Sequence, residues 1–213
     1  MKQLIAQYLF TNPWIPMAAW AVVYTSDYYL TIISAAWATG NPTIKFDKGF
    51  ELTPYFRDEV KRQKLFSPRF ALALLFMFFL IWAVWEIARR MELGQGYFEF
   101  LLGMLFLQEA AVHVRHFRNL VMFYYVRKGM GVEGSVKYRM WLSLKVSAAE
   151  LAGFALLYLA LAVVAGSWFA VGGFVGCIVT ANKHWRLATR DLDEQTLSGD
   201  GGAQQEDGGL THS

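Results

Sequence analysis

Residues 141–181, WLSLKVSAAELAGFALLYLALAVVAGSWFAVGGFVGCIVTA, decide the fold class. As a single helix this stretch would rise about 60 Å, twice the roughly 30 Å thickness of the hydrocarbon core of a bilayer. Gly166 and Ser167 interrupt the stretch and Trp168 follows them, a pattern typical of a tight turn at a membrane interface. The stretch therefore predicts two antiparallel membrane-spanning helices, the second of them rather short.

Three more apolar blocks precede this stretch, at Trp14–Ala38, residues 70–88 and residues 97–126. Each is about as long as the roughly 20 residues that a helix needs to span a bilayer. The 213-residue chain is 55% hydrophobic and only 17% charged, whereas soluble domains are about a quarter charged. These features predict an all-α membrane protein, a polytopic helical bundle of about five transmembrane helices. Pro13 and Pro16 break up any signal-peptide-like start, so we expect the first block to remain in the mature protein.

Basic residues fall mainly on one side of the predicted bundle. With five spans, the loops after the first and third spans lie on the same side as the C-terminus. Fourteen basic residues lie there, namely Lys45, Lys48, Arg57, Lys61, Arg62, Lys64, Arg69, Arg127, Lys128, Lys137, Arg139, Lys183, Arg186 and Arg190. Only Lys2, Arg89 and Arg90 lie on the other side. The positive-inside rule therefore predicts a multi-pass protein of the cell (inner) membrane, with its N-terminus outside and its C-terminus in the cytoplasm.

The predicted first cytoplasmic loop contains the pattern of a short amphipathic helix. Thr53 as N-cap and Pro54 at the first helical position predict a short helix, with Phe56 and Val60 on its apolar side. We expect this helix to lie at the interface and its basic residues to attract anionic lipid headgroups. Ser67 followed by Pro68 predicts the start of the second span.

The last residues differ in composition from the rest of the chain. Residues 191–213 contain six acidic residues, five glycines and no lysine or arginine, so they bury too little apolar surface to offset the entropy of ordering. We predict one transmembrane domain over residues 1–190 and a disordered acidic tail over residues 191–213. No nucleic-acid-binding motif is present, and the basic residues fit the membrane topology. We expect the bilayer to be the main partner; the sequence leaves a protein partner or a homo-oligomer open.

Three carboxylates fall well inside their predicted spans. Asp27, Glu109 and Glu150 lie about 20, 18 and 14 Å along their helices from the end at which each span begins. Since the first and third spans begin outside and the fourth begins inside, all three carboxylates are predicted near the middle of the bilayer. Charged residues at that depth are costly and often functional.

The third span is unusually polar. The cost of inserting its QEAAVHVRHFRN segment, residues 108–119, into the bilayer nearly cancels the favourable insertion energy of its apolar residues. At about 100° per residue, Glu109, His113 and His116 share one face, with Gln108, Arg115 and Asn119 on the adjoining strip. The far side, with Gly103, Ala110, Val114, Phe117 and Val121, suits lipid or close helix packing. Arg118 points elsewhere and is predicted to extend to the headgroups. The predicted intramembrane polar cluster is Asp27, Glu109, His113, Arg115, His116, Asn119 and Glu150.

Three interpretations of this cluster remain open. In the first, Glu109, His113 and His116 bind zinc or non-haem iron, and Asp27 or Glu150 could add oxygen ligands, since carboxylate and imidazole suit both metals. In the second, the same groups form an ion or proton relay. In the third, which we favour, they stabilise the bundle, with Asp27 or Glu150 paired to Arg115. We therefore expect no cofactor, with zinc or iron as the alternative.

Enzyme motifs are otherwise absent from the sequence. There is no G-x-S-x-G nucleophile elbow, and the single cysteine, Cys177, excludes a redox pair and is expected to be a buried packing residue. We expect a small integral membrane protein that is a non-enzymatic accessory or transport-type component, with ion or proton linkage. The alternative is a metal-dependent membrane enzyme with its site near the cytoplasmic face; the catalytic residues of such an enzyme are unknown.

Overall fold

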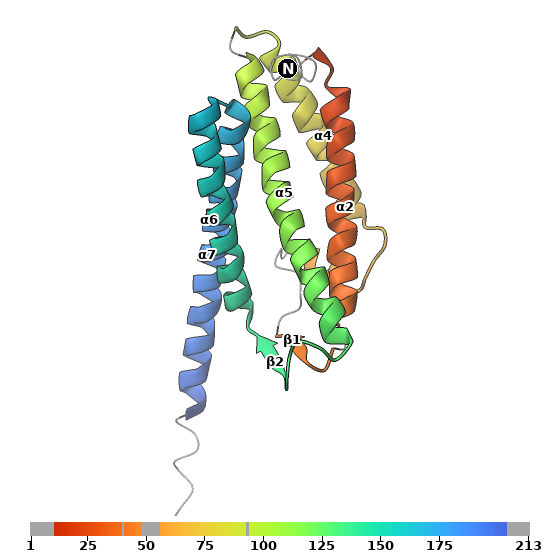
Figure 1. Cartoon of the computed structure of the whole chain (residues 1–213), viewed down its shortest axis with the longest axis vertical. Helices are drawn as coiled ribbons and strands as arrows, with labels where there is room; N and C mark the ends of the chain where they lie inside the picture. The colour runs from red at the N-terminus through yellow and green to blue at the C-terminus, as the bar shows by residue number, and fades with distance from the viewer. Residues whose placement is uncertain (1–10, 40, 48–55, 93, 204–213) are drawn as a thin grey trace, which may run out of the picture.

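The computed structural model describes residues 11–39, 41–47, 56–92 and 94–203. Five long helices lie side by side along the long axis of the molecule (Figure 1): α2 (Trp14–Ala38), α4 (Pro68–Ala88), α5 (Gly94–Arg127), α6 (Met140–Ala165) and α7 (Trp168–Ala203). The short helix α3 (Arg57–Lys61) and the strands β1 (Ile44–Phe46) and β2 (Val136–Tyr138) lie together near one end. The prediction of an all-α class is confirmed, apart from these two three-residue strands.

Three of the described helices, α4, α5 and α6, are long and apolar enough to cross a membrane. This composition supports membrane association. The surface agrees, because large apolar side chains such as Leu72, Phe79 and Leu156 are more than half exposed, as expected for side chains that face lipid.

Capping residues in the sequence explain where the helices begin and end. The Ser67 hydroxyl accepts a hydrogen bond from the Phe70 N–H, and Pro68 occupies the first position of α4, as predicted. Gly166 ends α6 in the left-handed conformation with φ 59°, which glycine adopts without steric penalty. The Ser167 hydroxyl then accepts the Ala170 N–H at the start of α7, so the predicted turn is confirmed.

Helix α7 is much longer than the short final span that we predicted. It contains 36 residues and continues across the expected domain boundary at residue 190 as far as Ala203. Two contacts support this extension: Arg190 pairs with Glu194 at 3.0 Å, and the buried Asp191 carboxylate accepts the Trp141 N–H at 3.1 Å. The first part of the predicted acidic tail is therefore helical, and residues 204–213 lie outside the described residues.

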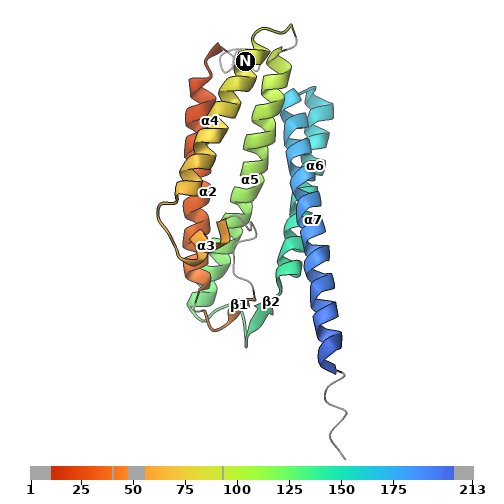
Figure 2. The ribbon, with the colours of Figure 1, turned by 180° about the vertical axis from the view of Figure 1, so that it is seen from behind.

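Helix α5 is the central helix of the bundle. It contacts α2 and α4 on one side and α7 on the other, while α6 packs mainly on α7 (Figures 1 and 2). Gly103 and Gly172 allow α5 and α7 to approach closely: a Cβ at Gly103 would lie 1.8 Å from the Phe169 carbonyl oxygen, and one at Gly172 would lie 2.0 Å from that of Phe100. Of the predicted far side of α5, Gly103 packs closely against α7, whereas Val114, Phe117 and Val121 are more than half exposed. Cys177 is fully buried in the α5–α6–α7 cluster, also as predicted.

The loop elements close one end of the bundle. β1 and β2 form a parallel pair in which Ile44 lies opposite Val136. Val60 of α3 is buried against Tyr28 and Ile32 of α2, so the apolar side of this short helix faces the bundle and not the membrane surface. The predicted cap at Thr53 and Pro54 lies outside the described residues.

Candidate functional site

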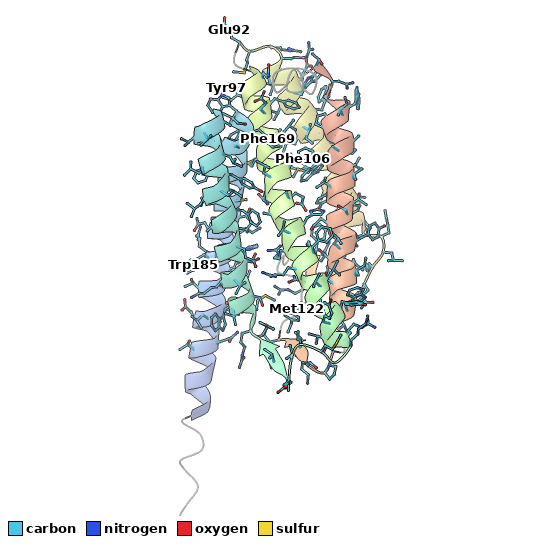
Figure 3. The ribbon with its side chains drawn as sticks, viewed as in Figure 1. Glu92, Tyr97, Phe106, Met122, Phe169 and Trp185 are labelled. Atoms are coloured by element: carbon cyan, nitrogen blue, oxygen red, sulfur yellow. The ribbon has the colours of Figure 1, made fainter. Side chains whose placement is uncertain are left out.

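The polar residues of α5 face an internal cavity of about 480 Å³. Residues of α2, α5, α6 and α7 form its walls, and Phe46, Phe56 and Tyr138 line it from the loop elements. Met122, labelled on the lower part of α5 in Figure 3, is one of the lining residues. The cavity therefore lies in the half of the bundle nearest β1, β2 and α3.

The residues of the predicted cluster meet at this cavity from three helices. Its polar and charged lining residues are Asp27 and Thr31 on α2, Gln108, Glu109, Arg115, His116, Arg118 and Asn119 on α5, Ser143, Ser147 and Glu150 on α6, and Thr180 and His184 on α7. Of the predicted cluster, only His113 is not part of this lining; it lies one helical turn from Glu109 and contacts Asp27 and Glu109. Asp27, Glu109 and Glu150, which were predicted at a common depth, all line this cavity.

Asp27, Glu109 and His113 form the tightest group. One ligand atom from each side chain lies within 4.8 Å of the other two. Two ionised carboxylates at that separation would repel each other by about 3 to 4 kcal/mol at an effective dielectric constant of about 20. The positive charge of Arg115 offsets part of this repulsion at Glu109. The group nevertheless favours taking up a proton or another cation.

Hydrogen bonds fix the His113 ring beside this pair. Its Nε2 lies 2.7 Å from the Ser26 hydroxyl, and its Nδ1 lies 2.9 Å from the Glu109 carbonyl oxygen. The same Nδ1 is 3.6 Å from Glu109 Oε1. The Ser26 hydroxyl donates to the Val23 carbonyl at 2.8 Å, so the ring is tied to both α2 and α5.

His116 contacts the same aspartate from the next turn of α5. Its Nε2 lies 2.8 Å from Asp27 Oδ1 and 3.2 Å from the Thr31 hydroxyl. His116 is 6% exposed, and its Nδ1 has no hydrogen-bond partner among the described residues. The three predicted metal ligands, Glu109, His113 and His116, therefore lie together, but Asp27 replaces His116 in the tightest group. Asp27 was predicted only as a possible additional oxygen ligand, because a helical wheel of α5 contains no information about α2.

The pairing of Arg115 with Asp27 or Glu150 stays a prediction, and one contact of Arg115 is with α6. Arg115 donates to the Ser147 hydroxyl, which lies 2.9 Å from His184 Nδ1. Arg118, predicted to extend to the headgroups, forms an ion pair with Glu150 while remaining half exposed. The reason is that α6 lies beside the outer strip of α5, so Glu150 reaches the more exposed of the two arginines. Arg118 also donates to the Asn119 side-chain oxygen at 3.2 Å.

Ser147 and His184 are functional candidates that the sequence prediction missed. His184 on α7 lines the same cavity as His116 on α5. The only signal in the sequence was the spacing of Ser147 and Glu150, one turn apart on α6.

A second, more apolar groove of about 340 Å³ lies between α5 and α6. Val114, Phe154 and Leu157 line it, and it shares Arg115, Arg118 and Glu150 with the main cavity. The three shared residues form a boundary between an apolar outer surface and the polar interior.

Comparison with known proteins adds no family to this description. No family model, curated protein or solved structure matches the chain. The functional argument therefore rests on the site itself.

Proposed function

We propose that this protein is a transport-type membrane component that binds and passes a cation through its internal cavity. The observation that carries the proposal is the Asp27–Glu109 carboxylate pair, which lies beside two histidines within a bundle of apolar helices. Intramembrane carboxylates and histidines are typical of ion and proton pathways. Glu109 is 8% exposed, and its Oε1 accepts no hydrogen bond among the described residues. A proton or a metal cation would satisfy that oxygen.

We further propose that all five long helices cross the inner membrane, with the N-terminus outside and the C-terminus in the cytoplasm. The basic bias of the loops supports this orientation. The two chain segments that carry β1, α3 and β2 would then be cytoplasmic, and Arg57, Lys61 and Lys137 would attract anionic headgroups. The cavity would lie in the cytoplasmic half of the bundle.

Cysteine accessibility tests this topology. The native Cys177 is fully buried, so it contributes little background labelling. Glu92→Cys and Glu133→Cys place the same substitution in exposed loops at opposite ends of the bundle. We expect a membrane-impermeant maleimide, added to intact cells, to label Glu92→Cys and to leave Glu133→Cys unlabelled until the cells are permeabilised. Labelling of Glu133→Cys in intact cells would contradict the orientation.

Flux measurements test the transport proposal. Full-length protein in liposomes should conduct protons or a divalent cation, followed with a pH-sensitive or a metal-sensitive dye trapped inside. Glu109→Gln keeps the shape of the side chain and removes its charge, so we expect the flux to fall at least about tenfold. Glu99→Gln, the same change on α5 at a residue hydrogen-bonded to Gln95, is the matched control and should match wild type. Wild-type flux no higher than that of empty liposomes, for protons and for divalent cations alike, would reject the proposal.

A second candidate function is a metal-dependent membrane enzyme acting near the cytoplasmic face. The cavity volume favours it, since about 480 Å³ is within the range of small-molecule sites and exceeds what a single cation needs. The apolar groove between α5 and α6 would offer a membrane-dissolved substrate a path to Arg115 and Arg118. Conversion of an amphiphilic substrate by purified protein, lost after metal chelation, would favour this candidate over transport.

A further inference from the structure

We infer that Asp27, Glu109 and His113 form a binding site for one divalent transition-metal ion. The inference rests on the proposed function in that it names the cation that the cavity binds. It depends on four observations: the spacing of the ligand atoms, an unsatisfied buried oxygen, the hydrogen bonds that orient the ligands, and the charge of the group.

The spacing suits shared ligation. Ligands held at about 2.0–2.2 Å in a tetrahedral site lie about 3.4 Å from one another. His113 Nδ1 and Glu109 Oε1 are 3.6 Å apart, and the three ligand atoms as a group lie within 4.8 Å. The group as a whole is somewhat wider than a tetrahedral site, so binding requires side-chain rotations that draw the three atoms together.

One buried oxygen of the group has no hydrogen-bond partner. Glu109 Oε1 is inaccessible to solvent and accepts no hydrogen bond among the described residues, and the residue as a whole is only 8% exposed. An unsatisfied buried carboxylate oxygen is strongly unfavourable. A metal ion between Glu109 and Asp27 would supply the missing contact and remove the repulsion between the two carboxylates.

Hydrogen bonds already orient the ligands as metal sites require. Ligating histidines usually hold the ring with a hydrogen bond from the other nitrogen. Each His113 nitrogen has a neighbour of this kind, the Ser26 hydroxyl at 2.7 Å or the Glu109 carbonyl at 2.9 Å. Whichever nitrogen binds metal, the other remains held. His116 Nε2, 2.8 Å from Asp27 Oδ1, is placed to orient the aspartate and is therefore a positioning residue.

Charge and donor type select the class of metal. Two carboxylates and one neutral imidazole carry two negative charges, which a divalent ion balances. A nitrogen ligand disfavours calcium and magnesium, which prefer all-oxygen sites, and the only thiol, Cys177, is buried elsewhere between α5, α6 and α7. Zinc, manganese and iron(II) are the ions that this donor set suits. Three protein ligands leave coordination positions for water or a bound molecule.

Metal titration of the full-length protein in detergent tests the site. Protein stripped with a chelator would be titrated with Zn²⁺ or with Co²⁺, whose visible absorption reports the ligand set. We expect one equivalent bound per chain and a higher melting temperature for the zinc-loaded protein. Glu109→Gln and His113→Ala should each weaken binding at least about 100-fold. His116→Ala should weaken it about tenfold and leave the positions of the cobalt bands unchanged, because the ligands themselves remain.

Controls separate loss of the site from loss of the fold. Glu99→Gln repeats the substitution on the same helix outside the group and should bind like wild type. Each variant would also be checked for its helical circular dichroism and gel-filtration profile, and Asp27→Asn provides a second ligand variant if His113→Ala fails to fold. Wild-type binding well below one equivalent, or full binding by both Glu109→Gln and Asp27→Asn, overturns the inference.

The proposed function fails under a different result. If the chelated wild type binds no metal but conducts protons in a Glu109-dependent manner, the metal site is wrong and cation transport stands. If it binds no metal and conducts neither protons nor divalent cations, both proposals are wrong. One bound metal that depends on Glu109, without flux of any cation, supports the site and rejects transport.

Discussion

Helices α4 and α5 are neighbours, but α5 buries far more of its apolar stretch inside the molecule than α4 does. In the most apolar 18-residue stretch of α4 only 6% of the residues are buried inside the molecule, whereas in that of α5 the share is 33%. The carboxylate of α4, Glu86, lies near the end of the helix, where it pairs with Arg89 and Arg90. The α5 carboxylate Glu109 is buried in the middle of its helix. A helix that faces lipid keeps its charges at its ends, whereas a central helix can place charges at mid-length because its neighbours surround them.

The largest expected effect on stability comes from a glycine at which the backbones of α5 and α7 are in close contact. Gly172→Ala on α7 would place a Cβ 2.0 Å from the Phe100 carbonyl oxygen of α5. The two helices would have to separate, so we expect the free energy of unfolding to fall by about 3 kcal/mol. Thermal unfolding in detergent, followed by circular dichroism, measures this change.

Gly153→Ala on α6 is the matched control. A Cβ there meets no atom within 4 Å, and alanine favours a helix by up to about 1 kcal/mol over glycine. Its melting temperature should stay the same or rise slightly. Equal losses in the two variants would show that α5 and α7 are not held by close backbone contact.

Features that belong to a single helix could be predicted from the sequence, whereas contacts between two helices could not. Each expected span is confirmed as a helix, and the cap at Ser67 and the turn at Gly166 are local signals read correctly. The contacts of Asp27 with His116 and of Arg118 with Glu150 depend on the rotation and register of neighbouring helices. A helical wheel of α5 alone contains neither contact. The β1–β2 pair was missed because three-residue strands have no recognisable periodicity.

The ion pair between Arg118 and Glu150 gives a middle-sized effect. Arg118→Leu leaves the Glu150 carboxylate without its partner. Breaking a fully buried pair costs about 3–5 kcal/mol. Because Arg118 is half exposed, we expect a smaller loss of about 1–2 kcal/mol, measured by thermal unfolding. The double variant with Glu150→Leu should recover part of it, since no unpaired charge remains.

The corresponding change on α4 is the control for this pair. Arg90→Leu leaves Glu86 bonded to Arg89 at the exposed end of the helix, so the melting temperature should not change measurably. A double variant no more stable than Arg118→Leu alone would mean that the loss comes from the packing of the arginine side chain and not from its charge.

The smallest effect concerns the part of α7 that extends beyond the predicted domain boundary. The Asp191 carboxylate accepts the Trp141 N–H at 3.1 Å, which satisfies a donor of the first turn of α6 that has no partner within its own helix. Asp191→Ala should therefore lower the free energy of unfolding by about 1 kcal/mol, as for the loss of a helix N-cap. Asp191→Asn keeps an oxygen acceptor and should recover most of that stability. Removing residues 197–213 leaves Asp191 in place and should not change the melting temperature. If the truncation destabilises the protein as much as Asp191→Ala does, the acidic end of the chain makes a stabilising contact of its own, and the boundary between the bundle and its tail lies beyond residue 196.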